Sequence, residues 1–463
     1  MAVNENKSTT FEQDTIEGEN VVVSIPISDN NENKNNNDDK NNNDYNNDNN
    51  NNNNNNKVES VNILSRPFFW VLLLFFIPAV VLKQYEIKHL ILFIFNFIAI
   101  IPLSSILTVG LDDLTARIGL KYASVLHAFS GNFVELVIES FALADKEYAI
   151  VRSAILGAVL CNITLVLGVA FLAGSWPTHR RRASKFYIKD SSFEAKLFVD
   201  TSSSMLALAV LALVIPAAFK IASTSSDENT NASDLECDVQ NISHATSIIL
   251  LLVFIGLLVF QLKTHVDQVI DAKEYEKLDP KYYWFFDIFL IAIAVSGIIF
   301  CARYLVTSVE DIAAEYRLGS GFIGVVIFPL CVCSNFIEHF SAIKCAYYDR
   351  VDTAMGLIMN TSVQMILLVT PILTLVGWII GRPLTLDFNV LEISVLACAV
   401  LIVNFLVADN RANWLEGYML VVSYFLIAIV FFYLPNSVEE DKDLYDCNPF
   451  SRHLLRKNTT SIH

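Results

Sequence analysis

Long apolar runs separated by short polar segments make up the chain from residue 67 to residue 434. Several runs reach about 20 residues, the length that an α-helix needs to cross a bilayer. The pattern predicts an all-α polytopic membrane protein. Its eleven transmembrane helices are expected near residues 67–83, 89–110, 123–144, 153–174, 197–219, 245–263, 283–306, 319–346, 353–379, 389–408 and 414–434. All five Trp fall near an end of a predicted span, as in the aromatic belts of membrane proteins: Trp70, Trp176, Trp284, Trp378 and Trp414.

Composition agrees with this pattern and adds the segments outside the bilayer. Hydrophobic residues make up 54% of the chain and charged residues 17%, which excludes an ordinary soluble domain. Residues 1–66 are polar and Asn-rich, so we expect a disordered tail, followed by the first transmembrane helix within residues 67–88. Residues 264–282 are expected to be a linker and residues 435–463 a C-terminal tail. The net charge of −16 lies partly in tails and loops, and nothing indicates nucleic-acid binding.

One short motif occurs twice within the apolar runs. Gly131-Asn132-Phe133-Val134-Glu135 and Ser334-Asn335-Phe336-Ile337-Glu338 share the pattern Asn-Phe-(Val or Ile)-Glu. A charged side chain deep in a bilayer costs a few kcal/mol or more, and intramembrane acids typically mark ion pathways. The alternative is a structural Glu, hydrogen-bonded to a neighbouring helix or permanently protonated. The repetition favours a duplicated ion site.

The two motifs lie in equivalent helices of two sets of five. Spans 2–6 occupy residues 89–263 and spans 7–11 occupy residues 283–434. Because five is odd, the second set crosses the membrane in the opposite sense, and the two Glu-bearing helices run antiparallel. The predicted fold is therefore one N-terminal helix plus two inverted repeats of five, which places a substrate site near the midplane where the repeats meet.

The helix after each Glu carries a polar cluster: Cys161-Asn162-Ile163-Thr164 in the first repeat and Asn360-Thr361-Ser362-Val363-Gln364 in the second. Such groups should face the protein interior, where they either line the site or join helices by hydrogen bonds. Carboxylate, amide and hydroxyl oxygens suit calcium, with manganese a close second. When the cation leaves, two apposed carboxylates should take up protons, because desolvation and mutual repulsion disfavour their charged forms. This competition is the minimal chemistry of an antiporter.

Basic residues and sequons predict the orientation. The loop between spans 4 and 5 (residues 175–196) holds six Lys and Arg, and the loop between spans 6 and 7 (residues 264–282) holds three Lys. The positive-inside rule therefore places both loops and the N-terminus in the cytosol. The C-terminus then lies on the lumenal side. Three N-glycosylation sequons fall on that side, at Asn231, Asn241 and Asn458. Cys237 and Cys447 also fall there, either as a disulfide or as two free thiols.

With these motifs in this order, the chain resembles the calcium/proton (cation/proton) exchanger family, the CAX branch of the cation/calcium exchanger superfamily. The resemblance runs from about residue 60 to 434 and covers Phe95–Leu107, Gly131–Leu143, Ile155–Gly174, Ser202–Phe219, Phe260–His265, Phe322–Ala342, Met355–Trp378 and Asp409–Phe432. It implies an exchanger of an acidic organelle such as a vacuole, in which helices 2 and 7 slide to switch access. Calcium and protons are its substrates, and no cofactor is implied. The implied calcium ligands are Glu135 and Glu338, with support from Asn132, Asn335, Asn162, Ser362 and Gln364.

Four further residues have expected roles. His339 matches the Glu-His pair of the family but points about 100° away from Glu338, so we expect it to support another ligand or relay a proton. Glu139, one helical turn beyond Glu135, is not part of the usual pattern; it either extends the ion path or, as we expect, reaches toward the lumenal interface. Asp112 and Asp113 end span 2 and either concentrate cations at a cytosolic entrance or lie in a solvated loop.

Other functional classes compete with this prediction. A sodium/calcium exchanger of the same superfamily would need more oxygen sites of fixed charge, and few additional acids lie near the paired Glu. A divalent-cation channel usually needs symmetric subunits around a pore, whereas an inverted repeat indicates alternating access. A transport-inactive scaffold would not need intact Glu135 and Glu338. No nucleophile or cofactor motif indicates an enzyme, and the oligomeric state is open, with a homo-oligomer compatible.

Overall fold

The structure of the protein is a computed structural model. It describes residues 76, 88–118, 126, 129, 131–176, 191–192, 197–226, 232–264, 283–331, 336–348, 350–409 and 411–434. The predicted tail 1–66, nearly all of the predicted helix in 67–83, most of the linker 264–282 and the tail 435–463 lie outside the described residues. Asn335, Asn231, Asn458 and Cys447 lie outside them as well.

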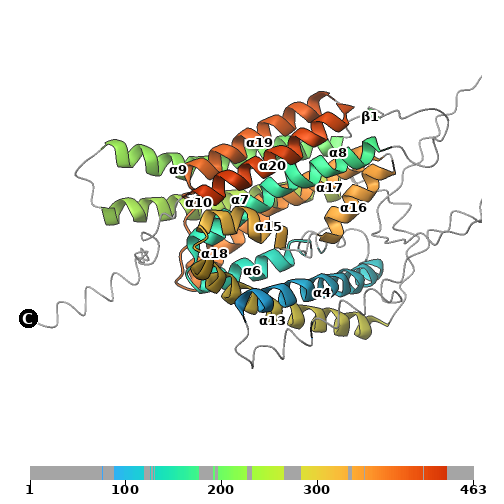
Figure 1. Ribbon diagram of the computed structural model, residues 1–463, viewed down its shortest axis with the longest axis horizontal. Helices are drawn as coiled ribbons and strands as arrows, with labels where there is room; N and C mark the ends of the chain where they lie inside the picture. Colours follow the sequence, from blue (N-terminus) through green and yellow to red (C-terminus); the bar gives the residue numbers. More distant parts are fainter. Residues whose placement is uncertain are drawn as a thin grey trace, which may run out of the picture.

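Within this range the chain is almost entirely helical, and its helices run side by side along the long axis of the molecule (Figure 1). The helices of the first half are α4 (His89–Ile118), α6 (Phe133–Ala144), α7 (Tyr148–Leu160), η3 (Cys161–Val166), α8 (Leu167–Ser175), α9 (Leu197–Ser226), α10 (Ala232–Val259) and η5 (Phe260–Thr264). Those of the second half are α13 (Trp284–Tyr316), α14 (Ser320–Phe322), η6 (Ile323–Ile327), α15 (Phe328–Cys331), α16 (Phe336–Tyr347), α17 (Val351–Gln364), η7 (Met365–Val369), α18 (Thr370–Ile379), α19 (Val390–Asp409) and α20 (Trp414–Tyr433). Segments labelled η are π-helices.

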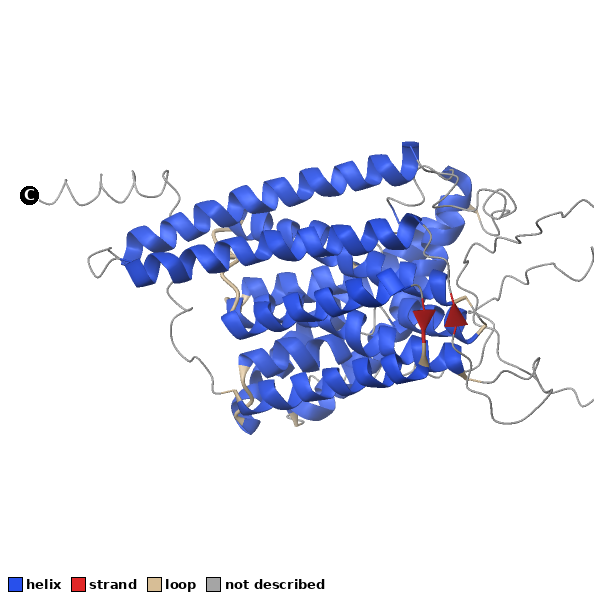
Figure 2. Cartoon of the chain, turned by 90° about the horizontal axis from the view of Figure 1, so that it is seen from above, coloured by secondary structure: helices blue, strands red, loops and turns tan. Residues whose placement is uncertain are grey.

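Two very short strands join distant parts of the chain. Strand β1 (Ser191–Ser192) pairs antiparallel with β2 (Arg411–Ala412), with Ser191 opposite Ala412. Figure 2 shows this pair at one end of the helical bundle.

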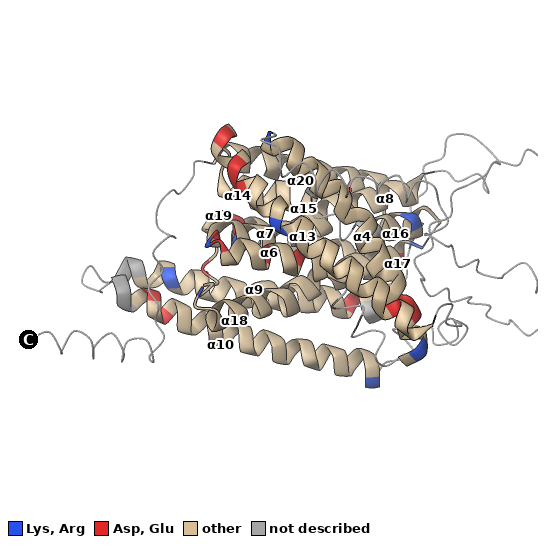
Figure 3. Ribbon diagram, turned by 90° about the horizontal axis from the view of Figure 1, so that it is seen from below, with Lys and Arg blue, Asp and Glu red and all other residues tan. Residues whose placement is uncertain are grey.

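Eight helices in the described part of the chain are long and apolar enough to cross a membrane. Several α and π segments are continuous, so Tyr148–Ser175, Leu235–Thr264 and Val351–Ile379 each form one candidate span. A shorter apolar helix covers Ser320–Leu330. Figure 3 shows most charged positions of these helices toward their ends, as expected when the middle of each helix faces lipid or a buried core. The multi-pass, all-helical prediction is therefore confirmed, and the number eleven stays a prediction.

The connection between the fifth and sixth predicted spans differs from the sequence interpretation. Apolarity placed a loop over residues 220–244, but α9 continues to Ser226 and α10 begins at Ala232. Both helices extend beyond their apolar parts because the intervening polar residues include good helix formers. The sequon residue Asn241 thus lies on an exposed position of α10 and not in a loop. Cys237, in the same helix, is disulfide-bonded. Its partner is none of the four described free cysteines, which are Cys161, Cys301, Cys345 and Cys398.

Helices α4 and α13 pack antiparallel along most of their length (Figure 1). At one end His89 Nδ1 of α4 lies 2.8 Å from Asp311 Oδ2 of α13. At the other end Arg117 Nε of α4 lies 3.2 Å from Asp287 Oδ2 of α13, and its Nη2 lies 3.1 Å from Asp113 Oδ2. The two helices are therefore joined by a His–Asp contact at one end and by Arg–Asp ion pairs at the other.

Several contacts between the two halves occur in equivalent pairs. Helix α8 packs against α16, and its equivalent α18 packs against α6. In the same way α8 packs against α20 and α18 against α10, and α7 packs against α19 and α17 against α9. The contacts α4–α13 and α9–α19 each join two equivalent helices.

One helix crossing depends on two glycines. A Cβ added at Gly157 of α7 would lie 2.5 Å from Val325 Cα, and one added at Gly324 of η6 would meet the Cβ and backbone of Ser153–Ala154. Only glycine permits backbones to come this close, as at small-residue interfaces between membrane helices. This crossing brings the middle of α7 against η6, the helix segment that precedes Glu338 in the chain.

Candidate functional site

The two repeated Glu occupy the same position in two short helices. Helix α6 begins at Phe133, directly after Asn132, and α16 begins at Phe336. Glu135 and Glu338 are each the third residue of their helix and lie in its first turn. The positive end of a helix dipole stabilises a carboxylate there, and helix ends within a membrane are typical of transporter ion sites. Glu135 is 4% exposed, so the carboxylate is buried within the protein.

The two copies of the motif meet in space. A Cβ added at Gly131 would overlap Glu338 Oε1 and would lie 3.2 Å from its Cδ. Glu338, from the second copy, therefore packs directly against the first residue of the first copy. The absence of a side chain at position 131 provides the room that this carboxylate occupies.

The polar clusters after each Glu also reach this site. Thr361 Oγ1 of α17 donates a hydrogen bond to Glu338 Oε2 at 3.0 Å. Asn132 Nδ2 donates to Gln364 Oε1 at 3.0 Å, and both residues are buried. Asn162 Oδ1, in η3, lies 2.7 Å from His339 Nε2. A hydroxyl group thus contacts Glu338 directly, and the two other contacts join the first half of the chain to the second through residues next to the repeated Glu or in the helices that follow them.

The Ser362 side chain makes its hydrogen bond within its own helix and not to either repeated Glu. Its hydroxyl is fully buried and donates to Ile358 O at 2.9 Å, within its own helix. Thr361, one residue earlier, makes the contact with Glu338 instead. Thr361 belongs to the same polar cluster, but the sequence alone does not show which of the two hydroxyls faces the site, because adjacent helical residues differ only in rotation about the axis. A role of Ser362 as a ligand stays a prediction.

Glu139 does not reach an interface, so that expectation was wrong. It is 3% exposed, and its Oε2 has no hydrogen-bond partner in the described part of the chain. It lies one turn beyond Glu135 on α6, the helix that packs against α7, α13 and α18. Burial among these three helices, which apolarity alone does not reveal, explains the difference.

Asp112 and Asp113 belong to the last turns of α4 and not to a solvated loop. Asp113 is 8% exposed and pairs with Arg117. The entrance role of both residues stays a prediction.

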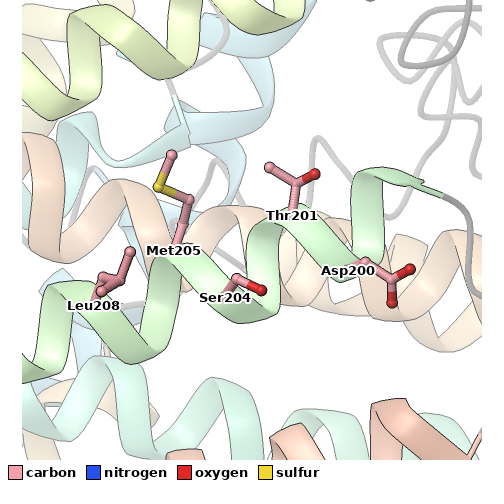
Figure 4. A pocket seen from close by; sticks show the side chains of 5 residues that line it. All are labelled: Asp200, Thr201, Ser204, Met205 and Leu208. Atoms are coloured by element: carbon pink, nitrogen blue, oxygen red, sulfur yellow. The ribbon is translucent and has the colours of Figure 1, made fainter.

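No group of three or more His, Cys, Asp or Glu side chains that could hold a metal is found among the described residues. A cation at this site would therefore depend on the two Glu together with amide and hydroxyl oxygens, which are the donors that calcium prefers. A hollow of about 290 Å³ lies elsewhere, along one face of α9 (Figure 4). It is lined by Asp200, Thr201, Ser204, Met205 and Leu208, and it contains none of the site residues.

Comparison with known proteins agrees with this geometry. A family model described as sodium/calcium exchanger protein matches residues 88–263 and 286–433. A protein described as a vacuolar calcium ion transporter from Schizosaccharomyces pombe is 34% identical over 376 residues, covering 81% of this chain and 87% of the relative. A Ca²⁺/H⁺ antiporter of Aphanothece halophytica is 30% identical over 379 residues, covering 78% of this chain and 96% of the relative. The crystal structure of the selenium-substituted Ca²⁺/H⁺ antiporter protein YfkE is 26% identical with a TM-score of 0.61, covering 80% of this chain and 100% of that one. The matched ranges include both Glu-bearing helices, and the chain belongs to the sodium/calcium exchanger protein family.

Proposed function

We propose that this protein is a secondary active antiporter that exchanges calcium for protons by alternating access. The observation that carries the proposal is the meeting of the two motifs: Glu338 packs against Gly131, four residues before Glu135. Two carboxylates balance the charge of one divalent cation. In a low-dielectric site they cannot both stay charged after the cation leaves, so protons replace it.

The groups around the carboxylates would complete the calcium site. We propose Asn132, Asn335, Asn162, Ser362 and Gln364 as further oxygen donors, and we add Thr361 because its hydroxyl already contacts Glu338. His339 holds Asn162 through a 2.7 Å contact, which fits a supporting role. Manganese, another cation with a preference for oxygen ligands, would fit the same donors.

The proposed architecture has eleven transmembrane helices, with one N-terminal helix before two inverted repeats of five. The equivalent pairs of contacts between the halves support it, as does the antiparallel packing of α4 and α13. The relatives described as vacuolar support residence in the membrane of a vacuole or another acidic organelle. We propose a cytosolic N-terminus and a lumenal C-terminus from the distribution of basic residues.

The test is radioactive calcium uptake into proteoliposomes that have an acidic interior. We expect wild-type uptake that collapses with a protonophore, and none in Glu135→Gln or Glu338→Gln. Glu315→Gln, at an exposed position of α13, is the matched control and should transport normally. Uptake that ignores the pH gradient and follows a sodium gradient would instead assign the protein to sodium/calcium exchange. No calcium or manganese uptake under either gradient would favour a transport-inactive scaffold.

A further inference from the structure

A row of buried polar side chains runs along one face of α10. Gln240, His244 and Ser247 lie four and three residues apart, which places them on the same side of the helix. They are 3%, 9% and 0% exposed. The face is turned toward α18, because the His244 ring stacks on Trp378 with 4.5 Å between centroids.

Each of these three side chains has a buried polar atom without a hydrogen-bond partner in the described part of the chain: Gln240 Oε1, His244 Nε2 and Ser247 Oγ. Leaving such an atom unsatisfied costs about 1–3 kcal/mol. Three unsatisfied polar atoms in succession on one helix face would destabilise a water-free interface substantially. Buried water removes this cost where several polar groups converge.

Ser243, on the same helix, shows the opposite arrangement. It is 0% exposed, its hydroxyl donates to Val239 O at 2.8 Å, and it accepts from Leu386 N at 2.9 Å. Its hydrogen-bonding capacity is met by protein. Ser243 lies on the same side of α10, three residues after Gln240 and four before Ser247, so burial on this side does not by itself leave a polar group unsatisfied. The unsatisfied atoms mark the positions that no described protein group reaches.

The polar row continues on α18 toward the ion site. Thr374 lies one turn before Trp378 and Thr370 one turn before that, and both are fully buried. Their hydroxyls donate to Thr370 O and Met365 O. Met365 directly follows Gln364, which accepts the hydrogen bond of Asn132. Helix α10 also packs against η7, the segment between Gln364 and Thr370.

We propose that this row, the α10–α18 seam (Gln240, His244, Ser247, Thr374 and Thr370), holds water and conducts protons between the start of α10 and the ion site. The inference rests on the proposed exchange of calcium for protons. Amide, imidazole and hydroxyl groups pass protons along hydrogen-bonded water, and a histidine can accept one proton at one ring nitrogen and release one from the other with no net change. The five residues of the seam contain no carboxylate, and Glu236, one turn before Gln240 on the same side of α10, adds only one. The row therefore offers calcium few of the roughly 6–8 oxygen ligands that it prefers. Protons and calcium would then reach the site by different routes.

His244 is the one ionisable side chain among the five residues of the seam. Neither α18 nor η7, which both pack against α10, carries a charged residue. The charged groups on α10 itself are Asp234, Glu236 and Asp238. Those on the other elements beside it are Lys263 of η5, Asp200 and Lys220 of α9, and Arg382 and Asp387 of the loop after α18.

The first experiment measures whether the seam is wet. In the purified full chain, Ser247→Cys and Ser243→Cys are treated with a small water-soluble methanethiosulfonate, and labelling at each position is followed by mass spectrometry of its peptide. Leu252→Cys, 62% exposed on the lipid-facing surface of α10, controls for detergent-covered positions. We expect the thiol introduced at position 247 to react at least about tenfold faster than those at positions 243 and 252, although positions 243 and 247 are equally buried. Equal or slower labelling at position 247 would overturn the proposal.

The second experiment measures proton transport. His244→Phe keeps the ring stacked on Trp378 and removes both nitrogens; Ser243→Ala is the control on the same helix. We expect His244→Phe to lower the maximal calcium/proton exchange rate about tenfold or more, within the usual contribution of a proton-transferring group. Calcium binding measured at equilibrium should stay within about twofold of wild type, because no seam residue is proposed as a ligand. An unchanged exchange rate in His244→Phe would overturn the proton route, whereas loss of exchange in the wild type would overturn the proposed function instead.

Discussion

The side chain of Asn132 donates a hydrogen bond to Gln364, 232 positions later in the chain, at 3.0 Å. Asn132 precedes the helix that carries Glu135, and Gln364 ends α17, the helix that follows Glu338. The bond therefore joins the two halves of the protein at the level of the proposed ion site.

This bond should couple the two residues in calcium binding. We expect Asn132→Ala and Gln364→Ala each to weaken calcium binding, and the double variant to lose less than the sum. The coupling should be about 1–2 kcal/mol, the range found for hydrogen bonds between membrane helices. A double-mutant cycle on the calcium dissociation constant measures it. Strict additivity would mean that the two amides act independently.

Gly131→Ala should damage the site without unfolding the protein. The added methyl group would occupy the space of Glu338 Oε1 and displace the carboxylate. We expect calcium affinity to fall roughly tenfold, which corresponds to about 1.4 kcal/mol. Gly256→Ala in α10 is the control, because a Cβ at that position has no neighbour within 4 Å. Isothermal titration of both purified variants compares them, and equal affinities would contradict this arrangement of Glu338.

Arg117 should stabilise the end of the α4–α13 pair. Asp287 is 0% exposed and Asp113 is 8% exposed, and Arg117 contacts both. Removing one partner of a buried ion pair typically costs about 3–5 kcal/mol, because charge is left uncompensated. We expect Arg117→Gln to lower the melting temperature in detergent and Arg117→Gln/Asp287→Asn to recover part of the loss. Full stability of the single variant would show that these ion pairs make no net contribution to the stability of the protein.

Asp387 should stabilise the loop between α18 and α19 down to strongly acidic pH. Its Oδ2 lies 2.5 Å from Lys220 Nζ and its Oδ1 lies 3.3 Å from Arg152 Nη1. Burial raises the pKa of Asp387, but the charges of Arg152 and Lys220 and the hydrogen bonds from Lys220 and Thr385 outweigh it and hold this pKa below its ordinary value of 3.8. A depressed pKa contributes stability above the unfolded value, and this contribution is lost as pH falls through the folded value.

The melting temperature of Asp387→Asn should therefore lie below that of the wild type by a constant amount between about pH 5 and 7, because Asp387 stays charged throughout that range. The difference should narrow only below about pH 4, where the unfolded carboxyl begins to protonate. Thermal melting of both proteins across this pH range tests it. A gap that narrows already near pH 6 would mean that another group is responsible.

Much of this architecture follows from sequence patterns. Apolar runs locate the long helices, and the repeated Asn-Phe-x-Glu motif identifies Glu135 and Glu338. The interruption at Asn132 is less visible, because the surrounding run is mostly apolar and Gly131 is the one residue in it that favours a break in a helix. The burial of Glu139 depends on which helices surround α6, and a single sequence does not contain that information.

The sequence does not show, for another reason, whether Thr361 or Ser362 contacts Glu338. The two side chains differ by about 100° around one helix, so the rotation of α17 decides which one faces Glu338. That rotation results from packing on both sides of the helix. The same limit applies to α10, whose polar face could be identified only after its contact with Trp378 was known.

Two of the π-helices have a consequence for movement. Segment η3 contains Asn162, and η7 begins directly after Gln364, so each lies at the site in the equivalent helix of its half. A π turn accommodates one more residue than an α turn, and such turns are frequent at functional sites. If one reverts to α geometry, the residues beyond it rotate by about 100° without the helix unfolding. Each of the two site helices thus contains one residue more than a continuous α-helix would. A change from π to α geometry can therefore turn an oxygen ligand toward or away from an ion.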